Sequence, residues 1–119
     1  MESYRDLIVW QKSMDLAVEI YRLIKLLPRE EMYGLSDQMR RSATSIPANI
    51  SEGYGRNATG DYIRFLNISR GSRHELETQL LICVRVGYLT ENQTALALKY
   101  CDEVGRMLNS LISKLSSNP

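Results

Sequence analysis

Apolar side chains recur along almost the whole chain with a period close to that of an α-helix. Leucine, isoleucine, valine and methionine follow steps of three and four residues through four segments, which are 6–27, 36–54, 59–86 and 91–116. Long helices joined by short connections pack most simply as antiparallel neighbours. The sequence therefore predicts an all-α fold, an antiparallel up-down-up-down four-helix bundle that occupies residues 1–119 as a single domain.

Residue types that start and stop helices mark the ends of these segments. Pro28 is expected to end the first helix, because the residue before a proline is pushed out of the α region. Ser36 is a plausible N-cap of the second helix, and Gly87 is a natural stop for the third. Thr90 and Gln93 have the spacing of a capping box at the start of the fourth.

The first helix is apolar on two opposite faces, whereas a bundle covers only one side of each helix. One stripe consists of Leu7, Trp10, Met14, Val18 and Tyr21. The second stripe, roughly 180° away at about 100° per residue, consists of Val9, Leu16, Ile20, Leu23 and Leu27. We expect the second stripe to face another copy of the chain, so the candidate oligomer interface is Leu16, Ile20, Leu23 and Leu27. The alternative is a wide core face that leaves some leucines exposed.

The second helix carries a polar stripe opposite its apolar one. Its members, at steps of four, four, three and four, are Arg41, Ser45, Asn49, Glu52 and Arg56. A solvated face with ion pairs four residues apart is the simplest explanation. However, serine and asparagine are poor residues for a helix interior, and Pro47 costs about 3 kcal/mol there and predicts a kink or a local break. The stripe therefore indicates a site or an interface, and the pattern does not choose between them.

Charge is nearly balanced over the chain but not along it. The chain has 15 basic and 14 acidic side chains and a net charge of +1. Between residues 38 and 74, six arginines stand against only Glu52 and Asp61, which makes this segment +4 and leaves −3 for the rest. Arginine suits bidentate pairing with phosphate or carboxylate, so the segment predicts contact with an RNA or DNA backbone, or with acids of a neighbouring subunit. The candidates for these polar contacts are Arg41, Asn49, Glu52, Arg56, Arg70 and Glu75.

Catalytic and metal-binding chemistry has little material in this sequence. The single histidine, His74, is expected to be an exposed helix residue. Cys83 and Cys101 stand 18 residues apart without the spacing of a zinc site, and we expect two reduced, buried thiols. No apolar run approaches the roughly 18 residues that span a bilayer, and the N-terminal residues do not form a secretory signal. The expectation is a cytoplasmic protein that is not an enzyme, with no cofactor, metal, small-molecule substrate or membrane partner.

The sequence resembles the bacterial four-helix-bundle family of 23S ribosomal RNA intervening-sequence proteins. The matching strings are YRDL at 4–7, VWQK at 9–12, QMRRSA at 38–43, SIPANISEG at 45–53, FL at 65–66 and RGS at 70–72, followed by Glu75, Leu76 and Leu80. The resemblance implies an antiparallel four-helix bundle, a homopentamer around a central channel, and a reading frame found within large-subunit ribosomal RNA genes with no established activity. A related family, the accessory proteins of diversity-generating retroelements, forms a similar pentamer that binds nucleic acid.

Together, the residues and the resemblance predict a helical bundle that assembles with copies of itself, as a scaffold or interaction protein. The alternative is an assembly that binds RNA or DNA through contacts between arginine and phosphate. Backbone binding weakens steeply with salt, so these two functions differ in a measurable property.

Overall fold

The structure, a computed structural model, describes residues 3–117, and every regular element in that range is helical. The elements in chain order are η1 (Tyr4–Asp6), α1 (Ile8–Ile24), η2 (Arg29–Glu31), α2 (Leu35–Tyr54), α3 (Thr59–Arg85) and α4 (Glu91–Ser116). The last three long helices agree with their predicted bounds to within one residue. Within this part of the chain, no helix is both long enough and apolar enough to cross a bilayer.

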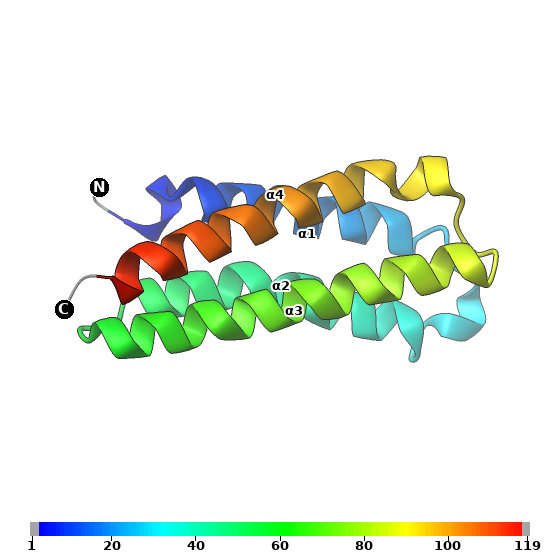
Figure 1. The fold of residues 1–119 in the computed structure, drawn as a ribbon. Helices are drawn as coiled ribbons and strands as arrows, with labels where there is room; N and C mark the ends of the chain where they lie inside the picture. The colour runs from blue at the N-terminus through cyan, green and yellow to red at the C-terminus, as the bar shows by residue number, and fades with distance from the viewer. Residues whose placement is uncertain (1–2, 118–119) are drawn as a thin grey trace.

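The four long helices form an elongated bundle in which each helix runs opposite to the one before it (Figure 1). Close backbone approaches join α1 to α2, α2 to α3, α3 to α4 and α4 to α1, and in the described part of the chain none joins a diagonal pair. The helices therefore stand at the corners of a square, so the α1/α2 face and the α3/α4 face lie on opposite sides of the bundle. The predicted four-helix bundle is confirmed.

Local chemistry explains where the helices begin and end. The Thr90–Gln93 capping box is confirmed, since Gln93 N donates to Thr90 Oγ1 over 3.1 Å and Thr90 N donates to Gln93 Oε1 over 2.9 Å. Gly87 has a φ of 85°, a conformation that glycine adopts without strain. The predicted cap at Ser36 is wrong, because α2 begins one residue earlier and its N-cap is Gly34. The first helix is shorter than predicted at both ends. Leu7 is extended, with a ψ of 123°, and separates η1 from α1, and α1 ends at Ile24 rather than just before Pro28.

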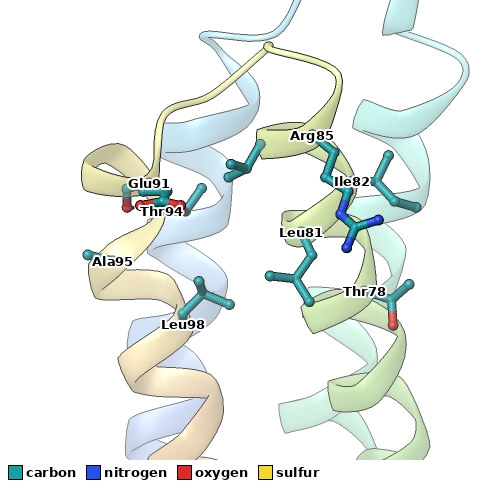
Figure 2. A pocket seen from close by; sticks show the side chains of 9 residues that line it. Thr78, Leu81, Ile82, Arg85, Glu91, Thr94, Ala95 and Leu98 are labelled. Atoms are coloured by element: carbon teal, nitrogen blue, oxygen red, sulfur yellow. Dashed lines mark hydrogen bonds between the residues drawn. The ribbon is translucent and has the colours of Figure 1, made fainter.

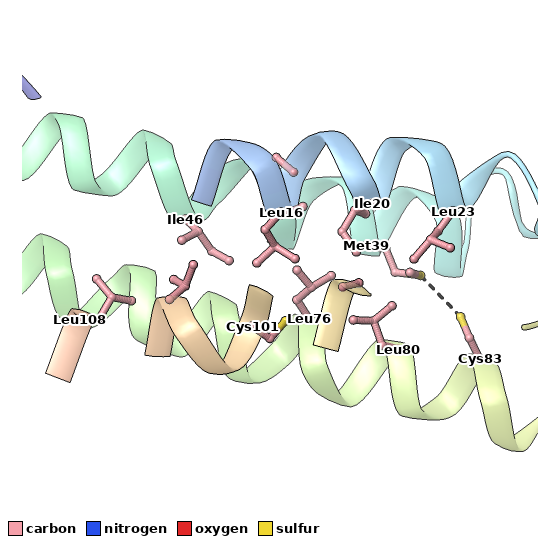
Figure 3. Packing of buried hydrophobic residues seen from close by; sticks show 14 of the residues in the cluster. Leu16, Ile20, Leu23, Met39, Ile46, Leu76, Leu80, Cys83, Cys101 and Leu108 are labelled. Atoms are coloured by element: carbon pink, nitrogen blue, oxygen red, sulfur yellow. Dashed lines mark hydrogen bonds between the residues drawn. The ribbon is translucent and has the colours of Figure 1, made fainter. Parts of the chain in front are cut away.

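The second stripe of α1 forms the core of the bundle, which corrects the expected oligomer interface. Leu16, Ile20 and Leu23 are fully buried and Leu27 is 8% exposed. In Figure 3, Leu16, Ile20 and Leu23 pack among side chains of α2, α3 and α4, and Leu27 belongs to the same core cluster. The sequence did not reveal which stripe is buried, because the period of a sequence fixes the angle between two stripes but not which one points inward. Branched aliphatic side chains at the centre fill this space without burying a polar atom.

The contact between α2 and α3 is close enough to hold a proline within a continuous helix. The predicted break at Pro47 does not occur, since α2 is helical from end to end. Ser69 of α3 donates to the carbonyl oxygen of Ile46 over 2.8 Å, and both residues are fully buried. At Gly53, a Cβ atom would stand 2.8 Å from Phe65 Cβ, so only glycine fits without moving α3. Packing and hydrogen bonding to α3 thus offset the poor helix propensity of this segment.

Candidate functional site

An apolar surface remains on the outside of α1. Met14, Val18 and Tyr21 are 39%, 67% and 43% exposed, and all three belong to the first of the two predicted stripes. Trp10 lies in the same stripe and is half-buried, with its ring edge-to-face against Tyr4 at a centroid distance of 5.2 Å. α1 therefore does present an apolar face outside the core, as predicted. That outer face is the first stripe, and not the second stripe that was expected there.

This surface forms one wall of a groove between α1 and α2. The groove has a volume of about 400 Å³, and its α2 wall consists of Thr44, Pro47, Ala48 and Ser51. These four side chains are short, which keeps the groove open beside the larger aromatic and aliphatic side chains of α1. The groove is therefore shaped to accept apolar side chains from another molecule.

A second apolar groove lies between α3 and α4, near the turn at Gly87. Its volume is about 630 Å³. Leu81 of α3 and Leu98 of α4 point toward each other across the gap (Figure 2), and Ala95 lines the α4 side. Leu81 and Ile82 are 50% and 43% exposed. The sequence does contain a signal for this surface, because four consecutive apolar residues at 80–83 cannot all face inward on one helix.

The α2/α3 interface is a polar seam that includes two of the predicted site residues. Ser42 donates to Glu75 Oε1 over 2.7 Å, and Ser72 donates to the Ser45 hydroxyl over 2.8 Å. The Asn49 amide donates to the Ser45 carbonyl oxygen over 2.8 Å, within α2. Glu75 thus accepts a hydrogen bond across the α2/α3 interface of the same chain, and Asn49 makes its hydrogen bond within α2 beside that interface. The small serine side chains allow the two backbones to approach closely.

The other four predicted polar residues are placed differently. Arg41 pairs with Asp37 at 3.0 Å within α2, and Arg56, in the turn after α2, pairs with Glu52 of α2 at 2.9 Å. Arg70 reaches across to α4, where its Nη1 donates to Asn109 Oδ1 over 3.1 Å. The structure therefore does not gather the six candidates into one site. They are distributed over the α2 surface, the α2/α3 seam and the α3/α4 face.

Most arginines of the basic segment are paired with carboxylates, and two of these four acids, Asp37 and Glu77, lie just outside the 38–74 window. Five of its six arginines have a carboxylate within 4 Å; these pairs are Arg40 and Arg41 with Asp37, Arg56 with Glu52, Arg64 with Asp61, and Arg73 with Glu77. Arg56 and Arg64 also flank Phe65, with their Cζ atoms 4.9 and 4.5 Å from the ring centroid. The sequence did not reveal this stack, because the eight residues between Arg56 and Phe65 include the turn that brings them together.

The side chains with catalytic potential are not arranged for catalysis. Burial raises the pKa of the Cys83 thiol to about 11 and that of the Cys101 thiol to about 12, so both stay protonated at neutral pH. Both are free thiols, as expected. His74 is exposed, and its Nδ1 lies 3.0 Å from the Arg70 carbonyl oxygen, one helical turn away. These three side chains therefore form no nucleophile–base pair.

Comparison with known proteins identifies similar chains. A family model described as 23S rRNA-intervening sequence protein matches residues 5–110. A crystal structure of a protein of unknown function from the S23 ribosomal protein family of Bacteroides thetaiotaomicron is 35% identical in sequence, with a TM-score of 0.82. That match covers 88% of this chain and 98% of the other. Among curated proteins, none matches this chain.

Proposed function

The chain belongs to the family of 23S rRNA-intervening sequence proteins, and from that premise we propose a cytoplasmic, non-enzymatic scaffold that assembles with copies of itself into a homopentamer. The observation that carries the proposal is the pair of unlike apolar grooves on opposite faces of one bundle. Exposed apolar surface of this kind marks interaction sites in soluble proteins. Free, buried thiols at Cys83 and Cys101 fit a reducing compartment.

The positions of the two grooves favour a ring over a simple dimer. If the α1/α2 groove of one copy packs against the α3/α4 groove of the next, the pair still has one free groove of each kind. Such a heterologous contact continues until it closes into a ring or grows as a filament. We take the number five from the resemblance carried by the SIPANISEG string at 45–53.

Sedimentation velocity at micromolar concentration tests this assembly. We expect one principal species with five times the 13.7 kDa mass of the chain. Its fraction should rise with protein concentration, because association follows mass action. A single species with the mass of one chain at every concentration contradicts the proposal.

Binding to an RNA or DNA backbone is a second candidate function, favoured by the stack of Arg56 and Arg64 on Phe65. Both guanidinium groups are well exposed, and each is paired with an acid only three or four residues before it in the chain. An exposed pair of this kind is worth only about 0.3–0.5 kcal/mol, so a phosphate can replace the carboxylate. A five-membered ring would present five copies of the stack and strengthen weak contacts through avidity.

Filter binding of a structured RNA at two salt concentrations tests the second candidate. On a duplex, log affinity should fall with log salt with a slope of about −0.9 for each phosphate contacted. Replacing Arg56 and Arg70 with alanine should weaken binding and leave assembly intact, while Arg106→Ala, which removes another exposed and paired arginine, should change little. Absent binding, or binding that salt does not weaken, contradicts this function. If the Arg56/Arg70 variant dissociates instead, these side chains hold subunits together.

A further inference from the structure

A pocket at the corner formed by the end of α1, η2 and the start of α2 gathers positive charge. Its volume is about 320 Å³, and Lys25, Arg29 and Arg40 all line it, one from each of three successive parts of the chain. It is separate from the two apolar grooves, with which it shares no lining residue.

The positive charge of this pocket is poorly neutralised. Lys25 and Arg29 form no ion pair with any residue between 3 and 117. Arg40 pairs with Asp37 at 3.2 Å, but the same carboxylate also pairs with Arg41 at 3.0 Å. One acid therefore serves two arginines, and the pocket keeps an excess of cations.

Neither acid of η2 lines the pocket, and one of them, Glu31, is held by other partners. Glu31 Oε1 accepts from the backbone N–H of Leu35 over 3.0 Å, and its Oε2 accepts from the Tyr88 hydroxyl over 2.8 Å. These hydrogen bonds lower the pKa of Glu31, so the carboxylate stays charged and occupied at the α3/α4 turn. It does not line the cationic pocket.

A hydroxyl without a protein partner also lines the pocket. Ser36 is only 7% exposed, yet its side chain makes no hydrogen bond with any residue that the structure describes. The hydroxyl oxygen is not fully enclosed by protein, so it is open to the pocket and free to hydrogen-bond a ligand. Ser36 lies in the first turn of α2, where the helix dipole favours negative charge.

We propose that this pocket binds the phosphate group of a small phosphomonoester, with the Ser36 hydroxyl, Lys25, Arg29 and Arg40 around the phosphate oxygens. A dianionic phosphate matches an excess of cations, and its oxygens accept hydrogen bonds from both guanidinium and hydroxyl groups. The apolar side of the pocket, which includes Ile24 and Leu27, suits a hydrophobic group esterified to the phosphate. This site does not depend on the proposed assembly.

Calorimetric titration of the full-length protein with three probes tests the site. Phenyl phosphate carries the dianion and an apolar group, inorganic phosphate carries the anion alone, and dimethyl phosphate stands for a nucleic-acid backbone diester. We expect the order of affinity to be phenyl phosphate, inorganic phosphate, then dimethyl phosphate. If dimethyl phosphate binds as well as phenyl phosphate, the pocket binds nucleic-acid phosphodiesters and the proposal is wrong.

Variants assign the binding to these side chains. The Lys25→Gln/Arg29→Gln double variant should lose about tenfold in affinity or more, equivalent to about 1.4 kcal/mol. Ser36→Ala should lose affinity without lowering the melting temperature of the ligand-free protein, because its hydroxyl has no protein partner to lose. Phenyl phosphate should raise the melting temperature of the native protein and not that of the double variant. Lys99→Gln, which removes an exposed lysine of α4, is the matched control and should bind as the native protein does.

Two outcomes overturn the proposal directly. One is the absence of heat and of thermal stabilisation with phenyl phosphate at millimolar concentration. The other is binding that Ser36→Ala and the double variant leave unchanged, or that Lys99→Gln weakens equally, since this indicates general attraction of anions to the surface.

Discussion

Val18→Asp and Leu81→Asp are each expected to abolish the closed assembly. Val18 is 67% exposed on the wall of the α1/α2 groove, and Leu81 is 50% exposed in the α3/α4 groove. A carboxylate placed in a closed apolar interface must give up its hydration without a partner, which costs several kcal/mol. The measurement is sedimentation velocity, with far-ultraviolet circular dichroism to verify that each variant stays helical.

A mixture of the two variants sharpens this prediction. The Val18→Asp chain keeps its α3/α4 groove and the Leu81→Asp chain keeps its α1/α2 groove, so the mixture has one intact contact between unlike chains. We expect heterodimers and no larger ring. If each groove instead packed on its own copy, one variant alone would still form dimers through its intact groove.

Ile8→Asp is the matched control for the assembly prediction. Ile8 is 64% exposed on α1, but it lies in neither apolar groove. This variant should assemble as the native chain does. If it dissociates as completely as Val18→Asp, or if neither groove variant dissociates, the two grooves are not the interface.

Leu16→Ala is expected to lower the free energy of unfolding by about 2–5 kcal/mol, because truncating a buried leucine removes packed methyl groups and leaves a cavity. Leu16 is fully buried at the centre of the bundle. Assembly makes the apparent stability depend on protein concentration. The loss is therefore measured by denaturant unfolding in the Val18→Asp background, where the chain is expected to be a monomer. Ile8→Ala in the same background should change stability by less than about 0.5 kcal/mol, as exposed positions usually do.

The same variant distinguishes the two stripes of α1. If Leu16, Ile20, Leu23 and Leu27 formed an intermolecular interface, Leu16→Ala would dissociate the assembly and leave the stability of the monomer unchanged. A loss of monomer stability below about 1 kcal/mol would contradict the core position.

Local sequence determined the helices and most of their ends. The Thr90–Gln93 capping box could be predicted because all of its atoms lie within four consecutive residues. The extended conformation of Leu7 could not be predicted, because the apolar period of the sequence continues on both sides of it. Local spacing also indicated the pairing of Arg56 with Glu52, four residues earlier, although Arg56 itself lies just after the end of α2.

Polar contacts between helices could not be predicted from the sequence. Ser42 and Glu75 are separated by 33 residues, and their hydrogen bond exists only because α2 and α3 pack side by side. The stack of Arg56 on Phe65 likewise requires the turn between these helices. The pocket around Ser36 brings together α1, η2 and α2, and no spacing along the chain marks it.

The sequence by itself determined that this protein is a four-helix bundle and that α1 has two apolar faces. Only the tertiary structure decided that Leu16 and Ile20 face inward while Val18 and Tyr21 face outward. The physical reason is that helical periodicity fixes the angle between stripes on one helix, whereas the direction of each stripe depends on the side chains that the other three helices bring against it. The tertiary structure thus placed the candidate interface on the opposite face of α1 from the one that the sequence pattern favoured.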